Sequence, residues 1–395
     1  MMTSDFKQSF ERELTGNILP FWVERTPDPV NGGFYGEVSN DLKVNNLVPR
    51  SAVLYGRILW TFAVAYRRYR QPQYLSTAQR AYEYLKMHFW DANFEGMVWT
   101  VNTCGEPLDT RKHTYAQAFS IYGLAEYYLA TSEEGSLDLA CRLFELVESH
   151  LHESVFAGYI ESRGRDWVSP ADQRLSALEP DCDKSMNTLL HLLEAYTNLL
   201  RAWDKPELRL RLRELLEIFL SRVIDGQTRH FHLFFNNDWT WPHQEHFSYG
   251  HDIEGSWLLL EAAQALGDAD LLQRTRSLAV QMAQAVYSEA LQPDGRVISE
   301  SSQDLHSRDL AWWVHAEAVV GFYNAYQISG QEYFRTASIH VWEFIQQNFI
   351  DHRHGDWFKT LDFQAKPYPD SPKVGAWECP YHHSRACLEM MDRLT

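Results

Sequence analysis

Apolar residues recur at positions i, i+3, i+4 and i+7 along most of the chain, the spacing of helices with an apolar face. This pattern predicts twelve helices, at 4–24, 49–70, 73–89, 111–131, 135–151, 182–203, 205–223, 249–266, 268–288, 307–329, 331–349 and 378–393. Short connections alternate with long ones of about 18 to 30 residues, which indicates repeated helix pairs.

The long connections resemble one another. Each contains a glycine or another turn residue beside a short strand-like run, and these runs lie at 32–38, 95–101, 157–162, 231–235, 294–298 and 355–359. The chain therefore consists of six repeats of a helix pair with a small hairpin, at a period of about 58 to 71 residues.

The helices of each pair differ in their surfaces. The helix at 49–70 is apolar on nearly all sides, whereas the helix at 205–223 has a charged outer face. A helix that is apolar all round is buried, and a one-sided helix lies outside. We therefore predict an all-α fold, an (α/α)6 barrel of six inner and six outer helices with short β-hairpins in the long loops, forming one domain over 1–395. An open solenoid would need distinct capping repeats, which the sequence lacks.

Composition narrows the choice of partners. The net charge is −17, so nucleic acid and anionic membranes are not expected partners. No run approaches the roughly 18 uninterrupted apolar residues of a membrane span. Five cysteines without a CxxC pair indicate reduced thiols rather than disulfides or a zinc ribbon. We expect a cytoplasmic protein, with a monomer as the default.

Polar residues interrupt the first part of every predicted inner helix, where burial is costly unless the polar groups are paired. They are Arg57, His113, Tyr115, Asp183, Asn187, His191, His251, Asp252, Glu254, Trp313, His315, Glu317, His382 and His383, with Trp377 just before the last helix. Six helix ends at one mouth of a barrel would place them around a single cavity. A buried structural network across the barrel is the alternative.

Several chemistries can be compared at such a cavity. His251 and Glu254, with another histidine, are a possible zinc set, but no HExxH motif occurs. An inverting glycosidase needs two opposed carboxylates, for which Glu254 and Glu317 are candidates. GxSxG and GxxxxGK[ST] motifs are absent. Histidines outnumber carboxylates, and imidazole is suited to removing a proton next to a carbonyl, which favours a metal-free site.

Longer motifs carry a resemblance to a known family. They are Gly250–Leu259, Trp312–Ala318 and Trp377–His382, with Tyr55–Arg57, Lys112–Phe119 and Asn187–Ala195. With these motifs the chain resembles the N-acylglucosamine 2-epimerase superfamily, and within it the cellobiose 2-epimerase branch. His315 stands where that branch usually has Gln, which keeps the mannobiose 2-epimerase branch open.

The resemblance implies an (α/α)6 barrel that inverts C2 of a reducing-end sugar without metal or other cofactor. It implies ring opening, removal of the C2 proton to give a cis-enediolate, and reprotonation on the opposite face by a second histidine. His251 and His382 would be this pair, with Glu254 orienting His251. His191 would assist ring opening, and Arg57 would stabilise the oxyanion. The implied substrate contacts are Tyr115, Asn187, Trp313, Glu317 and Trp377.

The implied substrate is a β-linked disaccharide or an oligosaccharide. The reaction would convert cellobiose to glucosyl-mannose, or mannobiose to mannosyl-glucose. An N-acylglucosamine 2-epimerase or a mannose isomerase-type activity is the alternative within the superfamily. An inverting glycosidase and a non-catalytic glycan-binding barrel are the alternatives from other classes.

Overall fold

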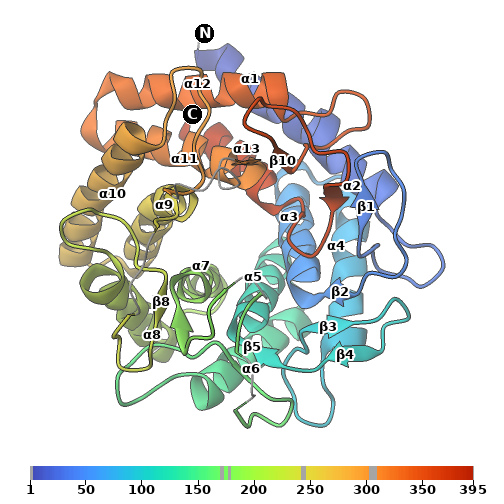
Figure 1. Cartoon of the computed structure of the whole chain (residues 1–395). Helices are drawn as coiled ribbons and strands as arrows, with labels where there is room; N and C mark the ends of the chain where they lie inside the picture. The colour runs from blue at the N-terminus through green and yellow to red at the C-terminus, as the bar shows by residue number, and fades with distance from the viewer. Residues whose placement is uncertain (1–2, 170–172, 177–178, 242–245, 302–308, 395) are drawn as a thin grey trace.

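The computed structural model describes residues 3–169, 173–176, 179–241, 246–301 and 309–394. In this part of the chain the helices form two concentric layers (Figure 1). The inner helices are α3 (Ala52–Tyr69), α5 (Thr114–Thr131), α7 (Met186–Ala202), α9 (Tyr249–Leu266), α11 (Trp312–Ser329) and α13 (Tyr381–Arg393). The outer helices are α1 (Thr3–Glu13), α2 (Leu19–Arg25), α4 (Pro72–Tyr84), α6 (Glu134–His150), α8 (Pro206–Ile218), α10 (Ala269–Glu289) and α12 (Glu332–Asn348).

The inner helices close into a ring. Each one packs against the next in chain order, and α13 packs back against α3. The N-terminal helix α1, blue in Figure 1, lies against the C-terminal α13 and so completes the outer layer. The predicted (α/α)6 barrel is confirmed, and the open solenoid is excluded.

Three outer helices contain a wider turn. These π-helical turns are η1 (Leu14–Ile18), η2 (Leu85–Phe89) and η3 (Phe219–Val223). The turn η1 joins α1 to α2, whereas η2 and η3 extend α4 and α8. The chain therefore stays helical over nearly the whole of the ranges predicted at 4–24, 73–89 and 205–223.

Short antiparallel strands link neighbouring repeats at the mouth of the barrel. They are β1 (Val38–Ser39), β2 (Arg50–Ser51), β3 (Thr100–Val101), β4 (Pro107–Asp109), β5 (Lys112–His113), β6 (Ser162–Arg163), β7 (Lys184–Ser185), β8 (Phe234–Phe235), β9 (Leu310–Ala311), β10 (Thr360–Leu361) and β11 (Pro372–Val374). A strand just before an inner helix pairs with the loop of the next repeat in β2–β3, β5–β6, β7–β8 and β9–β10. The pair β1–β11 joins the first loop to the last.

These strands correct the predicted starts of the inner helices. The helices expected from 49, 111, 182, 307 and 378 begin three to five residues later. In the described residues, strands β2, β5, β7 and β9 lie directly before four of these helices and pair with a neighbouring loop, and a loop precedes α13. Helix and strand both bury apolar residues here, so the short apolar runs did not distinguish them.

Close packing of the inner ring has a visible cause between α3 and α5. A Cβ atom on Gly56 would lie 2.5 Å from the backbone oxygen of Phe119, and one on Gly123 would lie 2.6 Å from that of Gly56. Glycine at both positions lets the two backbones touch.

The described helices include none with the length and apolar character needed to cross a membrane.

Candidate active site

A cavity of about 350 Å³ opens where the N-terminal ends of the inner helices meet the strand-bearing loops. Its lining is Arg57, Tyr115, Leu175, Ser176, Glu179, Asn187, His191, His251, Glu254, Ala311, Trp312, Trp313, Thr360, Trp377, Glu378 and His382. Of the residues expected to act on or bind the substrate, all but Glu317 lie in this lining. The helices thus bring residues as far apart in the chain as Arg57 and His382 to one place.

His382, near the start of α13, is held by a carboxylate. Its Nδ1 lies 2.8 Å from Oε1 of Glu317 on α11. An ionised carboxylate only accepts hydrogen bonds, so Nδ1 carries the hydrogen and Nε2 keeps its lone pair. Burial, with the nearby Arg57 and Arg385 cations, lowers the pKa of His382 well below its usual range. In its neutral form His382 has the tautomer that a base at Nε2 needs.

His191 on α7 has the same arrangement. Its Nδ1 lies 3.0 Å from Oε2 of Glu194, one turn further along the helix. Glu194 also accepts hydrogen bonds from Tyr381 and Arg385. Burial alone would raise the pKa of Glu194, but Arg385 and His191 lower it to about 2. Glu194 is therefore ionised and fixes the His191 ring.

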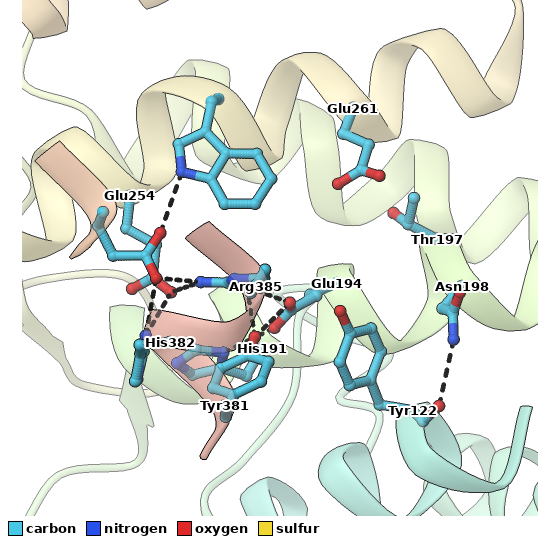
Figure 2. Close-up of polar contacts among 12 residues, drawn as sticks. Tyr122, His191, Glu194, Thr197, Asn198, Glu254, Glu261, Tyr381, His382 and Arg385 are labelled. Atoms are coloured by element: carbon cyan, nitrogen blue, oxygen red, sulfur yellow. Dashed lines mark hydrogen bonds and ion pairs between the residues drawn. The ribbon is translucent and has the colours of Figure 1, made fainter. Parts of the chain in front are cut away.

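Arg385 on α13 connects the two histidine–carboxylate pairs. Its guanidinium contacts Glu194, donates to Glu254 at 2.5 Å and donates to Glu317 at 2.7 Å. Figure 2 shows it between the Glu254 and Glu194 side chains. The guanidinium lies over the Tyr381 and Trp257 rings, and the residue is 2% exposed. One buried cation thus holds three carboxylates.

Sequence reasoning missed Arg385, Glu194 and Tyr381. A usable signal was present, because Arg385 follows His382 by three residues and therefore shares its helix face. A buried arginine on such a face needs an acidic partner. The sequence alone did not show that three carboxylates from three other helices would meet it.

The expected role of Glu254 toward His251 is wrong. Oε1 of Glu254 binds Arg385 and lies 3.8 Å from Nδ1 of His382, whereas Nδ1 of His251 lies 2.7 Å from the hydroxyl of Ser248. Arg385 holds the Glu254 carboxyl, and the His251 ring turns toward Ser248 at the start of its own helix. Burial and the neighbouring Glu317 raise the pKa of Glu254 to about 7.

The positions of the possible donor atoms bear on the zinc site that was considered from the sequence. His251 and Glu254 are not brought together as a ligand pair. Among the described residues, atoms of Glu254, Glu317 and His382 do lie within 4.8 Å of one another. The guanidinium of Arg385 binds both of these carboxylates, so a side chain of the protein already supplies the positive charge between them.

Two partly exposed tryptophans line the cavity. The ring centroid of Trp313 lies 4.8 Å from that of His251 and 5.6 Å from that of His382. Trp377 lies edge-on to Tyr115 at 5.7 Å. These rings offer flat apolar surfaces in the cavity wall. The neighbouring Trp312 also lines the cavity and was not predicted to do so.

Arg57 on α3 is a fixed cation at the cavity wall. It donates to the Tyr115 hydroxyl at 2.9 Å and lies over the Phe119 ring at 4.2 Å. The residue is 3% exposed, and its Nε has no partner among the described residues. Although burial opposes it, the charge persists, because nearby Tyr115 and Cys379 raise the pKa of Arg57 further.

Five of the polar residues expected at the cavity instead hold the surrounding loops. They are His113, Asp183, Asp252, His315 and His383, and none lies in the cavity lining. Both ring nitrogens of His315 are used, one by the oxygen of Ala311 at 2.8 Å and one by the N–H of Val297 at 3.0 Å. The prediction that every interrupting polar residue faces one cavity is therefore wrong, because the rim loops also need polar anchors on these helices.

Comparisons with known proteins agree with this geometry. The family described as N-acylglucosamine 2-epimerase (GlcNAc 2-epimerase) matches residues 33–386. A cellobiose 2-epimerase of Bacteroides fragilis is 43% identical, over 99% of this chain and 100% of the relative. The structure of a cellobiose 2-epimerase from Bacillus thermoamylovorans superimposes with a TM-score of 0.92 at 36% identity, covering 99% of this chain and all of that one. A sugar epimerase from a ruminal bacterium gives 0.93 at 37% identity, covering 100% and 99% of the two chains.

Proposed function

The chain belongs to the N-acylglucosamine 2-epimerase family and is an epimerase, and from this premise we propose that it inverts C2 of the reducing-end sugar of a β-linked disaccharide. Cellobiose is the first candidate substrate, because full-length relatives at 34–43% identity are named cellobiose 2-epimerases. Mannobiose is the second. The supporting observation is that His251 and His382 both contact the Trp313 ring at one cavity.

The reaction begins with the open-chain sugar, whose aldehyde makes the C2 proton acidic. In the proposed mechanism one of the two histidines removes this proton, and the electrons move into the C1 carbonyl to give a cis-enediolate. The C2–C3 bond rotates, and the other histidine returns a proton to the opposite face of C2. General acid–base catalysis of this kind contributes about 10²- to 10⁴-fold.

The remaining residues have supporting roles in this proposal. His191, fixed by Glu194, assists ring opening by moving a proton between the ring oxygen and the C1 hydroxyl. Arg57 is placed to stabilise negative charge as it develops on the oxygen of C1. Tyr115 and Asn187 bind sugar hydroxyls, and Oδ1 of Asn187 has no partner among the described residues. Trp313 and Trp377 stack on sugar faces.

Glu317 has a different role from the one expected. Sequence reasoning placed it among the substrate contacts, but its carboxylate binds His382, Arg385 and the Trp257 N–H. We propose that Glu317 acts through His382, by setting its tautomer and orientation.

We further propose that residues 1–395 form a single catalytic domain that works as a cytoplasmic monomer without metal or other cofactor. Helices from both ends of the chain complete the two layers, which supports one folding unit. Five free thiols support a reducing compartment.

Incubation with sugars in D₂O tests the proposed function. The panel is cellobiose, mannobiose, mannose and N-acetylmannosamine, followed by NMR and chromatography. The proposal predicts a C2 epimer of a disaccharide that carries deuterium at C2. Released monosaccharide without an epimer would instead indicate a glycosidase, and absence of exchange with the whole panel would indicate a binding protein.

A further inference from the structure

The residue at the N-cap of each inner helix occupies the same place in every repeat. These residues are Ser51, His113, Ser185, Ser248, Ala311 and Pro380. The hydroxyl of Ser51 accepts a hydrogen bond from the N–H of Leu54 at 3.1 Å, and Ser185 does the same with Thr188 at 3.2 Å. Two serines at this position therefore cap their helices in the usual way.

Ser248 at the start of α9 is different. Its side chain forms no hydrogen bond to the helix backbone, and its hydroxyl lies 2.7 Å from Nδ1 of His251. Its backbone is held from two directions, since Ser248 bridges to Glu300 and its oxygen accepts from the N–H of Asp252. The residue is 6% exposed, so the hydroxyl has few alternatives in solvent.

The partner of His251 also differs from those of the other cavity histidines. His191 and His382 each bind a carboxylate through Nδ1, and a carboxylate favours the charged imidazolium. A serine hydroxyl is neutral and stabilises the imidazolium less. Burial, with the nearby His191, lowers the pKa of His251 to about 3, and no carboxylate at Nδ1 offsets this effect.

We propose that Ser248 is a positioning residue for the reaction, which orients the His251 ring by accepting a hydrogen bond from its Nδ1–H and so leaves Nε2 as the reacting atom. This inference rests on the proposed function, in which His251 is one of the two acid–base groups. Because its partner is neutral, the contact fixes the His251 ring and its tautomer without favouring the imidazolium. The capping interaction seen in Ser51 and Ser185 is replaced by this role.

The matched variants are Ser248→Ala, Ser248→Thr and Ser51→Ala. Ser248→Ala removes the hydroxyl, Ser248→Thr keeps it, and Ser51→Ala removes a true helix cap from another inner helix. We expect Ser248→Ala to lower kcat by about three- to thirty-fold with little change in KM, the size expected for one lost hydrogen bond. Ser248→Thr restores most of kcat. Ser51→Ala lowers the melting temperature and leaves kcat within about twofold.

A spectroscopic measurement tests the same contact without turnover. Long-range ¹H–¹⁵N spectra of protein labelled at histidine report which ring nitrogen carries the proton, and His251→Gln assigns the His251 signals. We expect a protonated Nδ1 in the wild type and a shifted, tautomer-averaged pattern in Ser248→Ala. Wild-type kcat together with unchanged His251 signals in Ser248→Ala would overturn the inference. A wild-type protein that exchanges C2 of no sugar would overturn the proposed function instead, and the spectra would still test the hydrogen bond.

Discussion

The inner helices carry buried histidines on two sides, and the two sets differ in what their ring nitrogens bind. His382 faces the cavity, binds Glu317 through Nδ1 and keeps Nε2 for a substrate. His315 faces the loops and uses both nitrogens, on Ala311 and Val297. Both rings are buried on inner helices, so burial does not separate a reactive histidine from a structural one. A ring nitrogen that is unpaired and also lies at the cavity does.

The neighbouring residues His382 and His383 differ in which side of α13 they occupy. Nδ1 of His383 also has no partner among the described residues, but His383 lies outside the cavity lining. His383 turns away from the cavity, where its Nε2 binds Asp356 at 2.7 Å. Asp356 also pairs with Lys359, and these three side chains anchor the last long loop to α13. The helix α13 therefore supplies one histidine to the cavity and the next histidine to the loops around its rim.

The largest predicted effect is the loss of activity when a histidine that faces the cavity is removed. His251→Ala and His382→Ala each remove one acid–base group, so we expect epimerisation to fall by about 10³- to 10⁴-fold. Circular dichroism and melting temperature should stay close to the wild type, since each ring has an open side. If either variant keeps near wild-type turnover, the assignment of the two bases is wrong.

Arg385 provides the second comparison, because its loss affects the cavity and the core together. Arg385→Met leaves Glu194, Glu254 and Glu317 buried without their cation, which we expect to cost about 3–5 kcal/mol of unfolding free energy. Urea unfolding measures this loss. The double variant with Glu254→Gln should recover part of it, and a single variant as stable as the wild type would contradict the proposed charge balance.

Stability against pH tests the raised pKa of Glu254. A carboxyl with a folded pKa of about 7 and an unfolded value near 4.5 binds more protons in the folded state between these values. The contribution of this carboxyl to the free energy of unfolding is therefore fully present below about pH 4.5 and is lost as pH rises to 7. We expect Glu254→Gln to gain about 1–3 kcal/mol relative to the wild type between pH 5 and pH 8. A constant difference across this range would indicate an unshifted carboxyl.

The smallest effect is predicted for His315, the histidine that faces the loops. His315→Ala should lower unfolding free energy by about 1–3 kcal/mol through two unmade hydrogen bonds, with kcat within a few-fold of the wild type. His315→Gln keeps a donor and an acceptor and should be nearly neutral in both measurements. Loss of activity without loss of stability in His315→Ala would place this ring at the chemistry after all.

The periodic sequence predicted the barrel well, because six repeats of the same pattern leave few ways to bury the inner helices. It also placed the cavity, since polar residues such as Arg57, His191 and His251 interrupt otherwise apolar faces. It did not distinguish His382 from His383, or His315 from either, because which side of a helix faces the axis depends on its rotation in the ring. The departure at His315 consequently gives no reason to change the substrate, since the residue is outside the cavity lining.

Partners that meet across helices were also beyond the sequence. Arg385 joins carboxylates from α7, α9 and α11, and the nearest of these in the chain is 68 residues away. Ser248 is only three residues from His251, yet a serine before a helix normally caps it. Only comparison with Ser51 and Ser185 in the folded repeats shows that this serine has turned to the histidine.

The most direct test of two opposed bases is hydrogen exchange by single-histidine variants in D₂O. His251→Ala and His382→Ala are each incubated with a glucose-ended and a mannose-ended disaccharide, and C2 deuteration and epimer formation are followed by NMR. The two-base account predicts that each variant exchanges C2 of one epimer, a different one for each variant, and forms almost none of the other. Interconversion of the two epimers by either variant at the wild-type rate would contradict it.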